Sequence, residues 1–297
     1  METSSFHSAL VRIDGTVSVR GAAAARFPWW SFTKTALAIC ALRLVEEGLV
    51  DLDTLRPGKP FTLRQLLQHR AGVPEYCGLA SYHEAIARQE PPWSRERLLE
   101  AVGADRLDFA PGTDWAYSNV GYLFVREMIE EITGLDLAAG LRQFVTGPLE
   151  LTSVQLATRL SDFDDVYWPS RSGYDPAWVY HGCLTGTALD AATMLHALFS
   201  GRILSPDSLQ SMLETHPVGG AIPGRPWTLC GYGLGLMSGD MAEIGRAIGH
   251  SGSGPFCTNA VYHFPDASRP ITVATFTDSS EEGRAEFEAV RLALGDG

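Results

Sequence analysis

Residues 28–48 read PWWSFTKTALAICALRLVEEG, and this stretch decides how the rest of the chain is interpreted. Its small and apolar residues predict a helix from about Ser31 to Glu47, and Gly48 is a typical residue to follow the end of such a helix. Side chains three positions apart share one helix face, so Ser31 and Lys34 are expected to lie within hydrogen-bonding reach. Ser31 would stand at the helix N-terminus, where free backbone N–H groups can stabilise an oxyanion.

Lys34 has unusual surroundings for a lysine. The chain holds only two lysines, Lys34 and Lys59. The neighbours of Lys34 in the predicted helix include Trp30, Leu37 and Ala38. Burial lowers the pKa of a lysine, so its amine can act as a base toward a nearby hydroxyl. The alternative is an ordinary surface lysine on the first helical turn, and the S-x-x-K pattern by itself does not decide between the two.

A second candidate segment covers residues 109–119, FAPGTDWAYSN. Tyr117 and Asn119 stand two apart on an extended stretch and would face the same side. A phenol beside an ammonium group is biased toward phenolate and can transfer protons, while the amide of Asn119 could orient a substrate or hold Lys34. In the alternative interpretation Tyr117 is a core residue, and Ser118 or Asn119 is the N-cap of the next helix.

A third candidate segment covers residues 249–254, GHSGSG. Glycine beside a strand lets the backbone approach a ligand closely. The N–H of Ser253 would then be a second donor to an oxyanion, and His250 or Ser251 would bind the far side of the substrate. Taken alone, the segment is more typical of a glycine-rich loop that happens to contain one histidine.

Together these segments resemble the β-lactamase and penicillin-binding-protein-like serine hydrolases. The most similar branch holds class C β-lactamases, D-amino-acid peptidases and amidases, and related esterases. The motifs SFTK, YSN and HSG occur in that family's order and approximate spacing, at residues 31–34, 117–119 and 250–252. Connecting sequence is similar as well, at residues 61–74 (FTLRQLLQHRAGVP), 109–119, 184–190 (LTGTALD) and 232–235 (YGLG). The resemblance extends from about residue 8 to residue 290.

The resemblance implies specific catalytic roles. Ser31 would attack a carbonyl carbon to form an acyl-enzyme, and Lys34 and Tyr117 would take and return its proton. The backbone N–H groups of Ser31 and Ser253 would form the oxyanion hole, and Tyr117 would help to activate the deacylating water. The remaining site residues, expected to bind the substrate, are Asn119, His250, Ser251 and Gly252. No metal ion and no cofactor enters this scheme.

His250 is a departure from much of that family. Many β-lactamases and D-Ala-D-Ala carboxypeptidases have a lysine here that binds the substrate carboxylate, whereas a histidine is only partly charged at neutral pH. The favoured function is therefore hydrolysis of a small ester or amide, of the esterase or D-amino-acid amidase or peptidase type. A β-lactamase or D-Ala-D-Ala carboxypeptidase is the alternative within the family, and a non-catalytic ligand-binding relative is the alternative of another class.

The order of elements predicts a fold of class α/β plus all-α. A hairpin is predicted over residues 8–20, strands over 232–237, 259–264 and 271–277, and helices in the middle of the chain. The simplest packing is an antiparallel β-sheet flanked by helices with an inserted helical region, and the resemblance implies the same β-lactamase/transpeptidase-like fold. Residues 1–55 and 186–297 would form the α/β region and residues 56–185 the helical region, as one catalytic unit with its site between the regions.

Local signals predict further helices. A capping box at residues 62–65 (TLRQ) would begin a helix that ends near Gly72. Helical apolar spacing and capping signals predict the others; they cover residues 94–102, 121–132, 188–199, 206–213 and 280–294. Residues 158–182 are rich in Asp, Ser, Gly, Pro and aromatic residues and are expected to form a long ordered loop.

The composition limits the partners and the compartment. The 297 residues carry a net charge of -12, which disfavours nucleic acid and anionic membranes as partners and leaves a small ester, amide or peptide substrate. Five widely spaced cysteines indicate small apolar core residues in a reducing compartment. Neither a signal peptide nor an apolar run of transmembrane length is visible, which predicts a cytoplasmic protein; an exported protein with its leader removed would look the same. The oligomeric state is left open.

Overall fold

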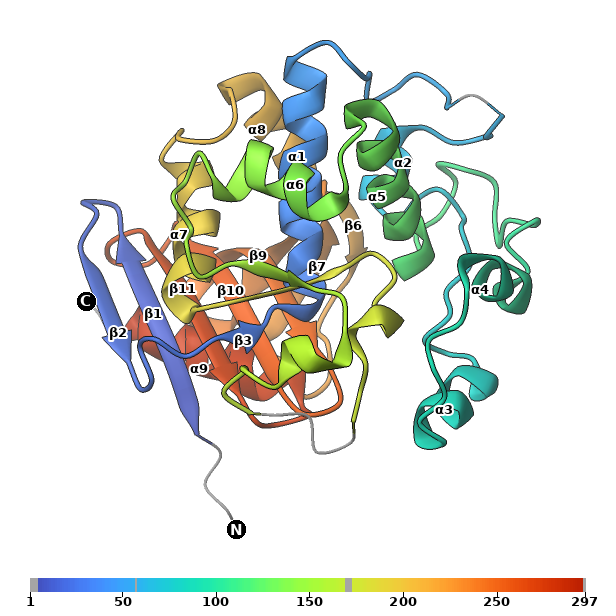
Figure 1. Ribbon diagram of the computed structural model, residues 1–297. Helices are drawn as coiled ribbons and strands as arrows, with labels where there is room; N and C mark the ends of the chain where they lie inside the picture. The colour runs from blue at the N-terminus through green and yellow to red at the C-terminus, as the bar shows by residue number, and fades with distance from the viewer. Residues whose placement is uncertain (1–4, 57, 169–172, 296–297) are drawn as a thin grey trace.

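A central antiparallel sheet dominates the computed structural model, which describes residues 5–56, 58–168 and 173–295 (Figure 1). Its eight strands follow the order β2-β1-β11-β10-β9-β8-β7-β6. Their bounds are β1 Phe6–Arg12, β2 Val17–Arg20, β6 His216–Gly219, β7 Trp227–Tyr232, β8 Met237–Met241, β9 Gly245–Ser253, β10 Thr258–Phe264 and β11 Ile271–Thr277. Since β1 pairs with β11, the two ends of the chain meet in one sheet.

Helices cover both faces of this sheet. Alternate residues of a strand point to opposite faces, and in β11 the side chain of Val273 packs in one hydrophobic cluster while those of Ala274 and Phe276 pack in another. Helix α9 (Glu282–Leu294) covers the Val273 face. Helices α7 (Ala188–Phe199) and α1 (Thr33–Glu46) contribute to the opposite cluster. The sheet is therefore the middle layer of a three-layer arrangement.

The middle of the chain forms the helical region. Helices α2 and α5 pack against each other, and α5 packs against α1, whereas α3 and α4 lie apart from the eight-stranded sheet (Figure 1). The helices are α2 Leu63–Leu67, α3 Ala80–Ala87, α4 Arg95–Val102, α5 Asn119–Thr133, α6 Leu137–Leu141 and α8 Pro206–Leu213; shorter helical turns are η1 Trp30–Phe32, η2 Arg142–Thr146, η3 Leu160–Phe163, η4 Pro176–Trp178 and η5 Ala242–Ile244. A small sheet of order β3-β5-β4 joins this region to the start of α1; its strands are β3 Phe27–Pro28, β4 Gln155–Ala157 and β5 Cys183–Gly186. No helix in the described part of the chain is long and apolar enough to cross a membrane.

The predicted fold class, an antiparallel sheet flanked by helices with a helical insertion, is confirmed. The hairpin around Asp14 and Gly15 is present as β1 and β2, and α7 and α8 have the predicted bounds. The division at residues 55/56 and 185/186 stays a prediction; β5 spans the second of these boundaries. The predicted loop over 158–182 contains η3 and η4, and its residues 169–172 lie outside the described residues, as do residues 1–4, 57 and 296–297.

Helix α2 is shorter than predicted. The capping box is present, because Gln65 N donates to Thr62 Oγ1 (3.2 Å) and Thr62 N donates to Gln65 Oε1 (3.0 Å). The helix ends at Leu67 instead of near Gly72, because His69 adopts a left-handed backbone conformation with φ +58°. Arg70 N then donates to Gln65 O (2.7 Å), which closes the helix end.

The strand predicted over residues 232–237 is wrong. The chain turns here between β7 and β8, with Gly233 N donating to Leu236 O (2.8 Å). Gly235 has φ +72° and lies directly on α1, where an added Cβ would be 2.5 Å from Ala38 Cβ and 3.0 Å from Lys34 O. Only glycine combines this backbone conformation with so close an approach, so the glycines that looked like part of a strand form a tight turn.

Gly235→Ala should destabilise the fold more than Gly48→Ala. Both glycines have φ near +70°, which costs an alanine about 1–2 kcal/mol. Nothing lies within 4 Å of a Cβ added at Gly48, whereas the contact with Ala38 should cost a further ~1–3 kcal/mol at Gly235. Urea denaturation of the two variants measures the difference directly, and equal losses would contradict the packing of this turn on α1.

Candidate active site

Ser31 lies in the helical turn η1, which leads directly into α1. The preceding residue, Trp30, has φ +44°, a strained conformation for a bulky residue. Trp30 is held there by its ring, whose Nε1 donates to Cys257 Sγ (3.3 Å) and whose atoms come within 2.2 Å of the position that a Cβ on Gly254 would take. This packing compensates for the strain at Trp30. The backbone conformation of Trp30 places Ser31 at the N-terminus of α1.

The side chain of Lys34 is fully buried, one helical turn after Ser31. Its Nζ lies 3.2 Å from Ser31 Oγ, 2.6 Å from Asn119 Oδ1 and 3.2 Å from His181 Nε2. Burial lowers the pKa of Lys34 to about 7, although the charge of Glu75 opposes this. At neutral pH a large share of the molecules therefore carries an uncharged amine beside the Ser31 hydroxyl.

Asn119 holds Lys34 from the first residue of α5. Ser118 is the N-cap of this helix, since its hydroxyl accepts from Gly121 N (2.9 Å). Asn119 in turn is fixed by Glu75, which accepts hydrogen bonds from both the backbone N and the Nδ2 of Asn119. The amide oxygen of Asn119 is thereby left facing Lys34.

Tyr117 approaches the same amine through its ring. Lys34 Nζ lies 4.8 Å from the centroid of the Tyr117 ring, and the centroid of the His69 ring lies 4.3 Å from the same point. Burial raises the pKa of Tyr117 well above its usual range, while a hydrogen bond with Ser31 works in the opposite direction. The resting side chain is thus a neutral phenol, which differs from the bias toward phenolate expected from the sequence.

His250 lies on β9 and is an uncharged group. Its Nε2 is 2.8 Å from the hydroxyl of Tyr232, and the residue is 2% exposed. Burial, together with the nearby charge of Lys34, lowers the pKa of His250 to about 3. A neutral imidazole whose Nε2 is engaged by Tyr232 does not offer the positive charge that a lysine would offer to a substrate carboxylate.

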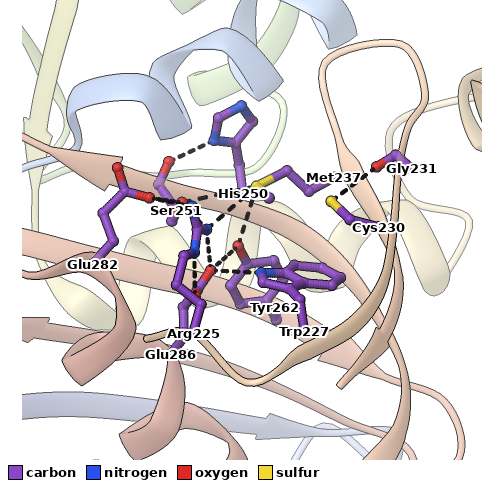
Figure 2. A network of polar contacts seen from close by, with 10 residues as sticks. All are labelled: Arg225, Trp227, Cys230, Gly231, Met237, His250, Ser251, Tyr262, Glu282 and Glu286. Atoms are coloured by element: carbon purple, nitrogen blue, oxygen red, sulfur yellow. Dashed lines mark hydrogen bonds and ion pairs between the residues drawn. The ribbon is translucent and has the colours of Figure 1, made fainter. Parts of the chain in front are cut away.

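Ser251 belongs to a polar network between β9 and α9 (Figure 2). Its hydroxyl donates to Glu282 Oε2 (2.9 Å) and accepts from Arg225 Nη2 (3.0 Å). Arg225 also forms ion pairs with Glu282 and with the fully buried Glu286. The other donors to Glu286 are Trp227 Nε1 and the hydroxyl of Tyr262. The Ser251 hydroxyl is therefore already engaged by protein groups and fixes β9 to α9.

Gly252 and Ser253 bring the end of β9 close to Ser31. A Cβ on Gly252 would lie 2.6 Å from the carbonyl oxygen of Trp29, so glycine permits a contact that no other residue would. Asn259 on β10 supports it, because Asn259 Nδ2 donates to Trp29 O (3.1 Å). Ser253, the last residue of β9, consequently lies next to Ser31 in the walls of the same cavities.

Two cavities meet at Ser31 and Ser253. The one named here the Tyr76 cavity has a volume of about 320 Å³ and is lined by Trp30, Ser31, Tyr76, Cys77, Tyr82, His83, Ile86, Asn119, Tyr174, Val179, His181, Ser253, Gly254 and Pro255. The Arg225 cavity has a volume of about 360 Å³ and is lined by Ser31, Trp115, Tyr117, Val218, Ile222, Arg225, Cys230, Tyr232, Met237, His250, Ser251, Ser253 and Glu282. A carbonyl group placed at Ser31 would have one cavity available for each of its two substituents.

The structure brings the predicted site residues together from three parts of the chain, residues 31–34, 117–119 and 250–253. The residues that the sequence did not indicate are Glu75, His181, Arg225 and Glu282. Glu75 directly follows the matched segment 61–74, and His181 stands three residues before segment 184–190. Proximity to these family-like segments is the one sequence feature that could have indicated a role for Glu75 and His181 in the site. Within the described ranges, no group of three His, Cys, Asp or Glu side chains is arranged to hold a metal ion.

Comparison with known proteins gives the family. The family model for Beta-lactamase matches residues 9–295. The chain belongs to the beta-lactamase family. The resemblance predicted from about residue 8 to residue 290 is thereby confirmed.

Individual members of the beta-lactamase family are distant from this chain. Lovastatin esterase of Penicillium rubens is 26% identical over 282 residues, covering 69% of this chain and 67% of that protein. D-aminopeptidase of Cereibacter sphaeroides is 24% identical over 289 residues, covering 89% of this chain and 54% of that protein. The structure of D-amino acid amidase from Ochrobactrum anthropi superposes with a TM-score of 0.81 at 21% identity, covering 98% and 95% of the two chains, which shows a shared fold. An esterase and a D-aminopeptidase, both among the types of hydrolase predicted, occur among the relatives by sequence.

The titration of Lys34 can be observed directly, because the chain contains only one other lysine, Lys59. In protein labelled with ¹³Cε-lysine, the Lys34 resonance should titrate with a midpoint near a pKa of about 7. The amine would be charged below that pH and neutral above it. Lys59→Arg leaves a single resonance and so assigns the signals; a Lys34 midpoint near the ordinary lysine value of 10.5 would contradict the effect of burial.

Proposed function

We propose that this chain is a serine hydrolase that forms an acyl-enzyme on Ser31 with a small ester or amide substrate. One observation carries the proposal, namely the 3.2 Å contact between Lys34 Nζ and Ser31 Oγ in a buried setting that makes the amine a base near neutral pH. A structural lysine would instead be exposed or paired with a carboxylate. Membership of the beta-lactamase family supports the same chemistry.

Acylation would begin with the neutral amine of Lys34. The amine accepts the proton of Ser31 as Oγ forms a bond with the carbonyl carbon, and the carbonyl oxygen becomes an oxyanion. The backbone N–H groups of Ser31 and Ser253 stabilise that charge. When the carbon–leaving-group bond breaks, Tyr117 donates its phenolic proton to the departing oxygen or nitrogen and is reprotonated by Lys34.

Deacylation would run through the same groups in reverse. A water molecule attacks the acyl carbon and loses its proton to Tyr117, which passes its own phenolic proton to Lys34. The bond to Ser31 Oγ then breaks, and Ser31 recovers its proton while the acid product leaves. In this scheme Asn119 keeps the amine in place, and the part of β9 containing His250, Ser251 and Gly252 forms one wall for the substrate.

The charges in the Arg225 cavity favour a neutral substrate over a carboxylated one. His250 is uncharged at neutral pH, and Arg225 is paired with both Glu282 and Glu286. The described lining of this cavity thus offers no unpaired cation to a carboxylate. This supports an esterase or D-amino-acid amidase or peptidase over a β-lactamase or D-Ala-D-Ala carboxypeptidase.

The proposed setting of this activity is the cytoplasm. All five cysteines are free thiols in the structure, and four of them are buried, as expected of apolar core residues in a reducing compartment. The proposed partner is a small-molecule ester, amide or peptide, and no part of the scheme requires a cofactor, a nucleic acid or a membrane.

Ser31→Ala should abolish turnover of p-nitrophenyl esters and the covalent adduct formed with a fluorophosphonate. Lys34→Ala and Tyr117→Phe should each slow acylation by on the order of 10²-fold or more, because each removes one proton-transfer group. In the unsubstituted protein the acylation rate should rise with pH through the pKa of Lys34, about 7, since only the neutral amine accepts a proton.

Intact-mass spectrometry of the fluorophosphonate adduct and stopped-flow measurement of nitrophenolate release provide these readouts. Ser211→Ala on α8 is the matched control, because it removes a serine hydroxyl away from both cavities. An adduct that persists in Ser31→Ala, or full activity in Lys34→Ala, would overturn the proposal. A long-lived adduct with penicillin would favour the β-lactamase or carboxypeptidase alternative.

His250→Lys should shift substrate preference toward carboxylated esters, because it places a cation in the wall of the Arg225 cavity. The ratio of kcat/KM for a carboxylated and a neutral ester of matched size measures this preference, and it should rise by about tenfold. His250→Gln, which keeps an uncharged hydrogen-bonding side chain beside Tyr232, is the control and should leave the ratio unchanged. An unchanged ratio in His250→Lys would remove His250 from the substrate-binding wall.

A further inference from the structure

His181 occupies a rigidly defined position against the start of α1. It precedes β5, and the chain turns there through Gly182, whose φ is +100° and whose N donates to Val179 O (2.7 Å). Strand β5 is bonded to the start of α1, since Leu184 N donates to Thr33 Oγ1 (3.0 Å). The turn and the strand together direct the His181 ring at the amine of Lys34.

His181 and Lys34 form a buried polar contact in which no carboxylate takes part. His181 is 2% exposed, and its Nε2 lies 3.2 Å from Lys34 Nζ. The other ring nitrogen, Nδ1, is buried without a hydrogen-bond partner among the described residues. If Lys34 donates in this contact, Nε2 accepts and the proton of a neutral imidazole resides on Nδ1.

The contact between His181 and Lys34 helps to determine which way the lone pair of the neutral amine points. A neutral amine has two N–H donors and one lone pair, and the described structure surrounds it with three polar partners. If Asn119 Oδ1 and His181 Nε2 accept the two N–H groups, the lone pair is left for the third partner, the Ser31 hydroxyl. Without one of the acceptors, the amine could rotate and turn an N–H toward Ser31 instead, in the wrong direction for proton transfer.

The chemical type of the acceptor also matters. A carboxylate in place of His181 would attract the ammonium form of Lys34 and raise its pKa, so the base would remain charged at neutral pH. A neutral imidazole accepts a hydrogen bond without that effect. Burial together with the charge of Lys34 lowers the pKa of His181 well below its usual range, which keeps the ring uncharged.

We propose that His181 is a positioning residue that, together with Asn119, holds the two N–H groups of neutral Lys34 and directs its lone pair at Ser31. This inference rests on the proposed acylation of Ser31 and adds to it a residue outside the three sequence motifs. His181 would act through Lys34 and would not itself exchange a proton with the substrate.

The test compares acylation rates in variants at this position. His181→Phe keeps a planar ring but removes the acceptor, whereas His181→Gln keeps an uncharged side chain that can accept a hydrogen bond from Lys34. Loss of one hydrogen bond to the reacting amine should slow single-turnover acylation by a p-nitrophenyl ester about 30-fold in His181→Phe. His181→Gln should remain within about threefold of the unsubstituted protein.

Controls separate positioning from structural damage. His196→Phe replaces another buried histidine, on α7 and away from both cavities, and should acylate at the normal rate. Equilibrium binding of a non-hydrolysable substrate analogue should be the same in His181→Phe as in the unsubstituted protein, since only the proton transfer is affected.

Two results would overturn the inference: normal acylation in His181→Phe, or equal slowing in His181→Phe and His181→Gln. ¹⁵N NMR of the unsubstituted protein tests it independently of whether the variants fold. His181 should be neutral with the proton on Nδ1, and a charged ring or a proton on Nε2 would contradict the inference. Failure of the proposed function is distinguishable, because the unsubstituted protein would then form no adduct on Ser31 at all.

Discussion

The burial of one amine, that of Lys34, is the constraint on which the site depends. A lysine enclosed by protein normally requires a carboxylate partner, but this Nζ is bordered by a hydroxyl, an amide oxygen and an imidazole, all uncharged. That environment disfavours the ammonium form and makes the amine a base near neutral pH. Burial of their own side chains likewise keeps Tyr117 a phenol and His250 a neutral imidazole. The groups that border Ser31 and Lys34 directly are therefore uncharged proton donors and acceptors.

The fold supplies the partners of Lys34 from segments far apart in the chain. The turn η1 carries Ser31 and helix α1 carries Lys34. Helix α5 begins with Asn119, and the turn before β5 carries His181. The meeting of both chain ends in one sheet places β9 alongside η1, with glycine at the closest contact, Gly252. The surrounding sheet and aromatic side chains compensate for the strained backbone at Trp30 and the close contact at Gly252. This packing makes the site rigid, so the reacting groups remain aligned.

Much of this arrangement could be predicted from local sequence, and the remainder depended on contacts that local sequence does not encode. Helix caps and apolar spacing predicted α7 and α8, and the S-x-x-K spacing predicted the contact of Ser31 with Lys34. The glycines of residues 232–235 were misassigned to a strand, because their need for close packing on Ala38 becomes visible only in three dimensions. His181 and Glu75 were missed for the same reason, since a lone histidine or glutamate has no spacing pattern. The phenol form of Tyr117 follows from its burial, which the sequence left open as the alternative to a reactive phenolate.

The central claim is that Lys34 is an uncharged base whose lone pair faces Ser31. Neutron diffraction from a deuterium-exchanged crystal, at a pH clearly above the Lys34 pKa of about 7, observes those hydrogens directly. The account predicts two deuterons on Nζ, directed at Asn119 and His181, and a deuteron on Ser31 Oγ directed at Nζ. Three deuterons on Nζ, with one directed at Ser31, would contradict it.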